Sequence, residues 1–263
     1  MRIGIVGYGI VGKHLERIFL RANFMISLYD KYVTQLNTRS AKEAIQSSDL
    51  VFVAVPTPQS KSGAADISAV EDVVSWIRRP LCIKSTIPPG TTDRLVSTYG
   101  KPIVFSPEYI GETPYHRSNK DISSDLVVFG GQKTDSIPFA EAYREALGPD
   151  PSYYFTDAIT AELAKYMENC FFATKVAFVA QFYKLSQSLG ADFDQLREIW
   201  ISDSRVGRSH SHVIGGPGFS GKCLPKDLAA IIAVAAGYGG APLLEAVQSY
   251  NRTLRGDHTD VIL

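Results

Sequence analysis

Short apolar runs alternate with amphipathic segments up to about residue 156. The runs are nearly continuous, which is typical of strands buried on both faces of a sheet. They lie at Arg2–Val6, Met25–Asp30, Leu50–Val55, Leu81–Ser85, Ile103–Ser106 and Leu126–Gly130. Helical patterns lie between them, near residues 10–21, 39–47, 67–78, 91–98 and 135–146. This alternation predicts an α/β fold, a doubly wound parallel sheet with helices on both faces.

The pattern changes after Tyr154. Asp157 is suited to cap a helix, neither Gly nor Pro occurs from Ala158 to Leu189, and Gly190 is suited to end one. We therefore expect a single helix of roughly 30 residues, about 45 Å long. Shorter helices are predicted near 192–202, 225–237 and 241–254. The chain is thus expected to divide into a sheet domain, 1–157, and an all-helical domain with one long central helix, 158–263.

Apolar side chains of the long helix spread over more than one stripe. They include Leu163, Met167, Phe171, Phe178, Phe182 and Leu185. One small helical domain has too little surface to cover them all, and an uncovered apolar face usually marks an interface. The sequence therefore predicts a homodimer formed through the helix 158–189.

Composition narrows the possible partners. Lys and Arg number 27 and Asp and Glu number 27, so the basic surplus of a nucleic-acid-binding protein is absent. Three cysteines are too few for a disulfide framework and predict a reducing, cytoplasmic setting. The sequence begins directly with a strand pattern, and no apolar run approaches the roughly 20 residues that span a bilayer. We expect no membrane span, no nucleic-acid partner and no metal site.

The first candidate site is GYGIVG, which follows the first strand and opens the first helix. Gly7 permits the tight turn, Gly9 lets a pyrophosphate approach the backbone, and Gly12 lets helix pack on strand. The helix N-terminus, which Ile10 and Val11 open, would hold the phosphates. Asp30 ends the second strand, where a carboxylate binds a ribose hydroxyl and repels a 2′-phosphate. These features predict a Rossmann-type domain that prefers NAD to NADP, although Lys31 next door weakens that preference.

Two further segments end the third and fourth strands: VAVPTP, Val53–Pro58, and KSTIPPGT, which begins at Lys84. Ligands of parallel sheets bind outside the carboxyl ends of the strands. Pro56 and the hydroxyls of Thr57, Ser85 and Thr86 are therefore candidate cofactor contacts. The alternative is ordinary turn chemistry.

SPEYIGET follows the fifth strand and contains Glu108, Tyr109 and Glu112. Carboxylates at this edge can act as acids, bases or substrate ligands, and the alternative is a solvated pair. On the long helix, Lys165 and Asn169 are four residues apart and share a face. They could stabilise an alkoxide as a hydride leaves. Alternatively, Lys165 forms a surface pair with Glu162, one turn earlier.

Cys223 stands in GFSGKCLPKD, Gly218–Asp227, between Lys222 and Lys226. Neighbouring cations favour the thiolate, which is the nucleophilic form. Asp227 would share its helix face and could orient a base or a water. Cys82 lies in an apolar strand and Cys170 in an apolar helix, so both are expected to be inert.

Together these motifs resemble the UDP-glucose/GDP-mannose dehydrogenase family. The resemblance extends to about residue 255 and includes the segments already quoted, ELAKYMEN with the following CFFATKVAF, and DSRVG. It implies oxidation of a nucleotide sugar's primary alcohol to a carboxylate with two NAD, most simply UDP-glucose to UDP-glucuronate. The aldehyde intermediate offers no good second hydride until a thiolate adds to it and rebuilds a tetrahedral carbon.

The resemblance also implies roles for individual residues. Cys223 would be the nucleophile, Lys165 and Asn169 would stabilise the oxyanion, and Glu108 or Asp227, with Thr86, would activate or position water. The implied NAD contacts are Gly7, Gly9, Ile10, Val11, Gly12, Asp30, Lys31, Pro56, Thr57, Thr86, Glu112 and Lys226. The implied contacts with the nucleotide sugar are Glu108, Tyr109, Lys165, Asn169, Arg205, Gly218, Phe219, Gly221 and Cys223. Arg205 would reach the site of a neighbouring subunit.

Two departures from the family pattern stand out. Ser220 replaces the glycine that the family usually has in the cysteine loop. Family members normally carry a third, nucleotide-binding domain, and we expect a short form without it. Two other functions stay open: a two-electron β-hydroxyacid-type dehydrogenase, which shares the Rossmann unit and the Lys/Asn pair, and a non-catalytic NAD-binding module.

Overall fold

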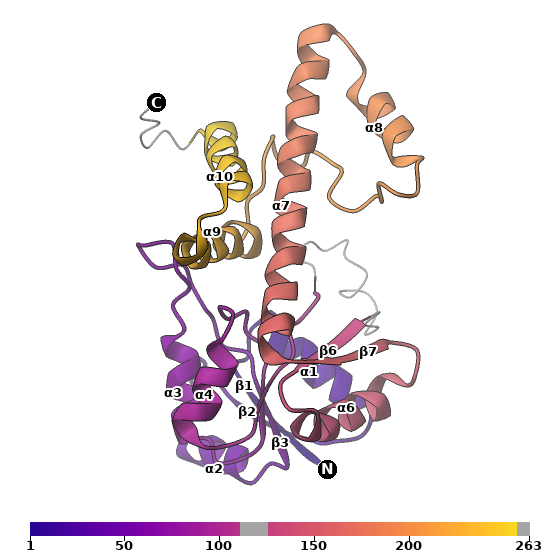
Figure 1. Cartoon of the computed structure of the whole chain (residues 1–263). Coiled ribbons are helices and arrows are strands. Elements are labelled where there is room, and N and C mark those ends of the chain that lie inside the picture. Colours follow the sequence, from indigo (N-terminus) through magenta and orange to yellow (C-terminus); the bar gives the residue numbers. More distant parts are fainter. Residues whose placement is uncertain (111–125, 257–263) are drawn as a thin grey trace. The chain divides into compact units, whose positions relative to one another are not determined.

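The computed structural model describes residues 1–110 and 126–256 of the chain (Figure 1). The chain forms two compact units. The sheet unit comprises Met1–Pro58 and Ala65–Lys165, and the helical unit comprises Gln59–Ala64 and Tyr166–Leu263. The division falls inside the long helix, a few residues beyond the sequence-based boundary at 157. That boundary, as a limit between independently folding domains, stays a prediction.

The described residues of the sheet unit form a seven-stranded sheet in the order β2-β1-β3-β4-β5-β6-β7. Its strands are β1 Arg2–Val6, β2 Met25–Tyr29, β3 Leu50–Val53, β4 Leu81–Ile83, β5 Ile103–Phe105, β6 Leu126–Gly130 and β7 Ser152–Thr156. Neighbours among these strands are parallel except β5 and β6, which pair antiparallel through Phe105 and Gly130. The sequence predicted six of these strands and a parallel sheet, so β7 and the reversal at β6 are additions to that prediction.

Helices cover both faces of the sheet. They are α1 Ile10–Arg21, α2 Arg39–Gln46, α3 Ser68–Trp76, α4 Thr91–Tyr99 and α6 Lys133–Leu147. Alternate residues of a strand point to opposite faces. Accordingly, Val51 and Val53 join an apolar cluster with α2, α3 and α4, whereas Phe52 joins a cluster with α1 and α6. The doubly wound α/β fold predicted from the sequence is confirmed.

The long helix α7 runs from Ala158 to Leu189, as the sequence predicted (Figure 1). Asp157 caps it, because its Oδ1 accepts from the Thr160 N–H at 2.8 Å. Gly190 follows with a φ of +68°, a left-handed conformation that glycine adopts without strain. The chain continues through α8 Phe193–Ile201, α9 Cys223–Ala235, the short 3₁₀ helix η1 Ala236–Tyr238, and α10 Pro242–Arg255.

The helical unit has an apolar core of its own. Cys170, Ala173 and Ala177 of α7 pack with Leu228 of α9 and Val247 of α10. Phe219, from the loop before α9, adds its ring to the same cluster.

Candidate active site

The glycine loop after β1 is shaped by close backbone contacts. Gly7 has a φ of +94°, and a Cβ there would lie 2.4 Å from the Ala54 carbonyl oxygen. A Cβ on Gly12 would lie 2.0 Å from the Gly7 oxygen, whereas one on Gly9 would meet open space. Gly7 and Gly12 are therefore required by packing, and Gly9 leaves room beside the start of α1, where Ile10 and Val11 lie. A phosphate placed there would face the helix N-terminus.

Asp30 joins the end of β2 to the glycine loop. Its Oδ2 accepts from the Tyr8 N–H at 2.7 Å, and its Oδ1 accepts from the Tyr32 and Val33 N–H groups. The carboxylate therefore fixes the loop at the site where a ribose is predicted to bind. Lys31 is exposed beside it. Contact of either residue with a cofactor stays a prediction.

The side-chain hydroxyls that follow β3 and β4 form hydrogen bonds with backbone carbonyls. Thr57 donates to the Thr86 carbonyl at 2.8 Å, and Ser85 donates to the Val55 carbonyl at 2.6 Å. This is the turn chemistry that the sequence left as an alternative. It leaves the hydroxyl lone pairs available as acceptors, and Thr86 and Pro56 remain accessible to solvent.

Glu108, after β5, is paired inside the sheet unit. Its Oε2 lies 3.4 Å from Nζ of Lys84, which is buried and also donates to Ser106 Oγ at 3.2 Å and the Pro107 carbonyl at 3.3 Å. The alternative of a solvated carboxylate is therefore wrong for Glu108. Glu112, the other acid predicted here, lies outside the described residues.

Other titratable groups lie around this ion pair. Burial lowers the pKa of His14 in α1, which is close enough to Glu108 and Lys84 to sense both charges. Burial raises the pKa of the Cys82 thiol to about 12. Cys82 is therefore a protonated core thiol at neutral pH, as its apolar strand predicted.

The start of α7 is anchored to the sheet unit by Glu162, which is fully buried. Its carboxylate accepts from the backbone N–H groups of Gly90 and Thr92 and from the Thr92 hydroxyl, at 2.6–2.8 Å. Glu162 thereby caps α4, a role that sequence reasoning missed, and it is not an exposed partner of Lys165. Lys165 itself is buried, with Nζ 4.7 Å from the centre of the Tyr109 ring.

In the helical unit, Cys223 is the first residue of α9 and is half-buried. The helix begins two residues earlier than the sequence predicted, so the thiol lies at a helix N-terminus, where the helix dipole favours negative charge. Asp227, one turn later, is buried; its Oδ2 accepts from Asn169 Nδ2 at 2.5 Å, and its Oδ1 pairs with Lys226. Cys170 is buried near Asp227, and burial raises its pKa to about 12.

The loop before α9 is held by Asn251 of α10. Oδ1 of Asn251 accepts from the Phe219 N–H at 2.7 Å, and its Nδ2 donates to the Phe219 carbonyl at 3.0 Å. The Phe219 ring is buried in the apolar core, so contact of this residue with substrate stays a prediction. Gly221 is exposed, with a φ of +86°. Sequence reasoning missed Asn251, because its partner is 32 residues away.

Arg205 lies in the loop after α8. Its side chain is 88% exposed and pairs with Asp203. Nζ of Lys175 holds this loop by donating to the carbonyls of Val206 and Gly207 at 2.9 and 2.8 Å. The exposure agrees with an outward-facing role for Arg205, which stays a prediction.

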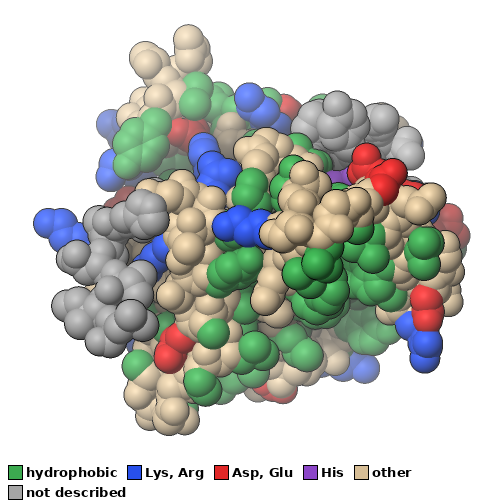
Figure 2. Space-filling view, turned by 90° about the horizontal axis from the view of Figure 1, so that it is seen from above, with side chains coloured by type: hydrophobic (Ala, Val, Ile, Leu, Met, Phe, Trp, Pro, Cys, Tyr) green, Lys and Arg blue, Asp and Glu red, His purple; other side chains and the backbone are tan. Residues whose placement is uncertain are grey.

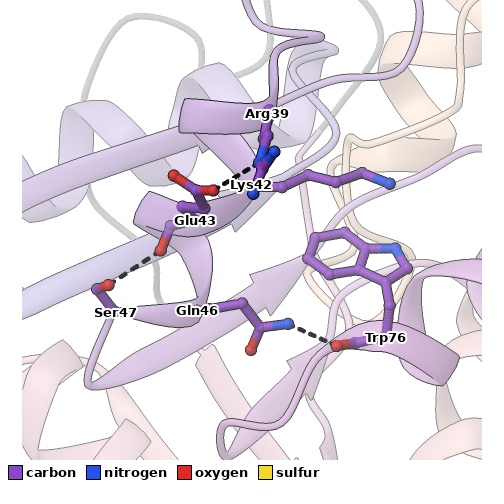
Figure 3. A pocket seen from close by; sticks show the side chains of 6 residues that line it. All are labelled: Arg39, Lys42, Glu43, Gln46, Ser47 and Trp76. Atoms are coloured by element: carbon purple, nitrogen blue, oxygen red, sulfur yellow. Dashed lines mark hydrogen bonds and ion pairs between the residues drawn. The ribbon is translucent and has the colours of Figure 1, made fainter.

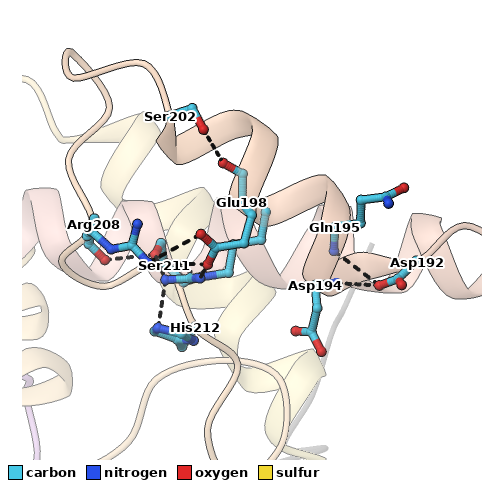
Figure 4. Close-up of polar contacts among 9 residues, drawn as sticks. Asp192, Asp194, Gln195, Glu198, Ser202, Arg208, Ser211 and His212 are labelled. Atoms are coloured by element: carbon cyan, nitrogen blue, oxygen red, sulfur yellow. Dashed lines mark hydrogen bonds and ion pairs between the residues drawn. The ribbon is translucent and has the colours of Figure 1, made fainter.

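Polar contacts at Ser211 and His212 hold the same loop further along the chain (Figure 4). Arg197 of α8 donates to the Ser211 carbonyl at 2.9 Å and to the Ser211 hydroxyl, contacts Nε2 of His212 at 2.6 Å, and pairs with Glu198. Burial, followed by the Arg197 charge, lowers the pKa of His212. The loop that carries Arg205 is thus held at Val206 and Gly207 and again at Ser211 and His212.

A surface pocket of about 490 Å³ lies in the sheet unit between α2 and α3 (Figure 3). Lys42 Nζ lies 4.9 Å from the centre of the Trp76 ring, and Gln46 donates to the Trp76 carbonyl at 2.5 Å. Each helix precedes a parallel strand, so Gln46 and Trp76, near the helix ends, lie toward the N-terminal edge of the sheet. The pocket is therefore separate from the predicted NAD site, which follows the carboxyl ends of the strands.

Within the ranges 1–110 and 126–256, no helix is long and apolar enough to cross a membrane. In the same ranges, no group of three His, Cys, Asp or Glu side chains could hold a metal ion.

The glycine loop and the doubly wound sheet define the dinucleotide-binding domain of a dehydrogenase class. Residues 27–146 match the NAD binding domain of the UDP-glucose/GDP-mannose dehydrogenase family, and residues 159–253 match its central domain. The chain belongs to this family, and NAD is confirmed as the cofactor of its nucleotide-binding domain. The UDP-glucose 6-dehydrogenase of Rickettsia bellii is 31% identical over 242 residues, which cover 85% of this chain and 55% of the relative.

Solved structures agree with this assignment. A UDP-glucose dehydrogenase from Pyrobaculum islandicum superposes with a TM-score of 0.82 and 26% identity, covering 96% of this chain and 68% of that one. The 3-hydroxyisobutyrate dehydrogenase of Mycobacterium tuberculosis has a TM-score of 0.73 and 20% identity, covering 98% of this chain and 95% of that one. The second likeness shows the fold alone. The chain spans about half the length of the curated relatives it matches.

Proposed function

We propose that this chain carries the NAD and thiol chemistry of a nucleotide-sugar 6-dehydrogenase, with UDP-glucose as the substrate. The observation that carries the proposal is the arrangement around Cys223: a half-buried thiol on the first residue of α9, one turn before an Asp227 held by Asn169 and Lys226. A thiol at a helix N-terminus with a fixed carboxylate nearby suits covalent catalysis.

The proposed reaction has two oxidations and one hydrolysis. Bound NAD would provide the hydride acceptor for each oxidation. The alcohol carbon first loses a hydride and its hydroxyl a proton, which gives an aldehyde. The Cys223 thiolate adds to the aldehyde carbon, and loss of a second hydride from that carbon leaves a thioester. Water then attacks the thioester, releasing the carboxylate and regenerating the thiol.

The remaining residues fit supporting roles. Lys165 and Asn169 lie one turn apart on α7, both buried, and would stabilise negative charge on the substrate oxygen. Asp227 or Glu108, with Thr86, would position or activate the water. The glycine loop and Asp30 would hold the dinucleotide, with Lys226 and Thr57 as further contacts.

The first test is a panel of UDP- and GDP-sugars with NAD. We expect UDP-glucose to give the highest rate, with about two NADH formed per sugar and the acid as product, because a thiol-bound intermediate allows the second hydride to leave. NADH absorbance and mass spectrometry of the product measure both quantities. If no nucleotide sugar gave NADH while NAD bound tightly, the chain would be a non-catalytic NAD-binding module.

A two-electron β-hydroxyacid dehydrogenase is the second candidate. It is favoured by the fold shared with the 3-hydroxyisobutyrate dehydrogenase and by the buried Lys165 and Asn169 on α7, which a two-electron oxidation can also use. A β-hydroxyacid would then be the preferred substrate, only one NADH would form per molecule oxidised, and Cys223→Ser would retain full activity.

We also propose that the chain forms a homodimer through α7. Met167, Phe171, Phe178, Phe182 and Leu185 are exposed on this helix. Their spacings of three, four and seven residues place them on one face, so the expectation of more than one stripe is wrong for these residues. Ile199 of α8 is exposed as well. In the view of Figure 2, hydrophobic side chains lie at the surface in several groups, between polar and charged ones. A second copy of the same helix presents a matching apolar stripe.

The dimer is tested by analytical ultracentrifugation at micromolar concentration. We expect the wild-type chain to sediment as a dimer and Phe178→Glu/Phe182→Glu as a monomer, because a buried charge disfavours the interface. Tyr32→Glu, at an exposed position in the sheet unit, is the control and should remain dimeric. A monomeric wild-type profile would contradict the proposal.

A further inference from the structure

The side-chain amide of Asn251 binds both backbone groups of a single residue in the cysteine loop. It accepts from the Phe219 N–H at 2.7 Å and donates to the Phe219 carbonyl at 3.0 Å. Asn251 is buried near the end of α10. The side-chain amide offers an acceptor on one atom and a donor on another, whereas aspartate lacks the donor and leucine lacks both.

Gly218 allows the amide to approach so closely. Its φ is +92°, and a Cβ at this position would lie 2.6 Å from Oδ1 of Asn251. The neighbouring Phe219 ring packs in the apolar core with Cys170, Leu228 and Val247. Residue 219 is therefore fixed twice, through its backbone by Asn251 and through its ring by the core.

The fixed residue lies just before the thiol. Three residues, Ser220–Lys222, separate Phe219 from Cys223, so the Cα atoms of Phe219 and Cys223 are at most about 14 Å apart when the chain is extended. Gly221 in this span is exposed and has a φ of +86°, a left-handed conformation that favours glycine. The position of Phe219 therefore limits how far the loop that leads into Cys223 can move.

We propose that Asn251 is a positioning residue for the Cys223 thiol, acting through the backbone of Phe219. This inference rests on the proposed function, in which the Cys223 thiolate adds to the aldehyde carbon of the substrate. Misplacing a reacting group by about 1 Å can cost about 10²-fold in rate. Only the thiol-dependent second oxidation needs this placement, so loss of Asn251 affects acid formation more than aldehyde formation.

The test compares Asn251→Leu, which removes both hydrogen bonds at similar volume, with Val247→Ala. Val247 lies one turn earlier on α10 and faces the same core without a hydrogen bond to the loop. The first readout is the ratio of aldehyde to acid formed from UDP-glucose. We expect Asn251→Leu to lower the rate of acid formation about 10²-fold and to release aldehyde, whereas Val247→Ala keeps the wild-type ratio.

The second readout needs neither substrate nor cofactor. It is the rate at which iodoacetamide alkylates Cys223 in the folded protein, mapped by mass spectrometry. Cys82 and Cys170 are buried thiols whose pKa is raised to about 12, so they stay protonated and unreactive. We expect Cys223 to be alkylated several-fold faster in Asn251→Leu than in the wild type, because the loop before it is no longer held. In Val247→Ala the rate should match that of the wild type.

The proposal would be overturned if Asn251→Leu kept both the wild-type rate of Cys223 alkylation and the wild-type ratio of aldehyde to acid. It would also be overturned if Val247→Ala changed these two quantities as much as Asn251→Leu does. If Asn251→Leu does not fold, Asn251→Asp makes the same comparison, since it keeps the acceptor for the Phe219 N–H but not the donor. If the wild-type chain makes no acid from any nucleotide sugar, the proposed function fails, and the alkylation rates still decide whether Asn251 positions the thiol.

Discussion

Replacing Cys223 with serine is expected to stop acid formation while the first oxidation continues. The thiol is the first residue of α9, half-buried, with Asp227 one turn later on the same helix. A serine hydroxyl is a much weaker nucleophile than a thiolate at neutral pH, so the aldehyde is not captured and no second hydride leaves. We expect the rate of acid formation to fall by on the order of 10³-fold or more.

The experiment traps aldehyde with a hydrazine reagent and counts NADH per sugar consumed. Wild-type enzyme should give about two NADH and acid, and Cys223→Ser about one NADH and trapped aldehyde. Cys82→Ala is the control; it removes a buried thiol from the sheet unit and should keep the wild-type product. Acid formation at the wild-type rate by Cys223→Ser would exclude the covalent route. A folded variant that makes neither product would show that the thiol is also needed for the first oxidation.

Features set by neighbouring residues could be predicted from the sequence. The limits of α7 follow from Asp157, which caps the helix, and Gly190, which ends it in a left-handed conformation. The turn at Gly7 follows from the same kind of local requirement, since only glycine fits beside the Ala54 carbonyl. The inert character of Cys82 and Cys170 could be inferred from the apolar residues around them, and burial raises the pKa of both thiols.

Features set by distant contacts could not be predicted. Glu162 caps α4 from about 70 residues away, and Asn251 binds a loop 32 residues before it. Strand β7 lies at the edge of the sheet, and its half-exposed residues lack the continuous apolar run of a buried strand. The Lys84–Glu108 pair joins the ends of two strands, and neither residue carries a local signal that it is buried.

Replacing Lys84 with methionine is expected to destabilise the sheet unit by about 3–5 kcal/mol. The side chains of Lys84 and Glu108 are only 2% and 11% exposed, so water screens neither charge well. Oε2 of Glu108 is buried and has no hydrogen bond among the described residues, so loss of the ammonium group would also remove its counter-charge. An uncompensated buried charge costs more than the intact pair contributes.

The double variant Lys84→Met/Glu108→Gln is therefore expected to recover most of the stability lost in Lys84→Met, since it removes both charges. Lys101→Met is the matched control. Lys101 donates to the carbonyls of Val74 and Ile77 in the same unit and pairs with no carboxylate in the described structure, so its loss should cost only about 1–2 kcal/mol.

These free energies of unfolding are measured by urea titration. The fluorescence of Trp76, in α3 of the sheet unit, monitors the unfolding. A Trp200→Phe background removes the chain's other tryptophan, so the signal reports the sheet unit. Two results would contradict the prediction. In the first, Lys84→Met lowers the free energy of unfolding no more than Lys101→Met does. In the second, the losses of stability in Lys84→Met and in Glu108→Gln add up to the loss in the double variant. A strong coupling would show that the charge of Glu108 is stabilised chiefly by its pairing with Lys84.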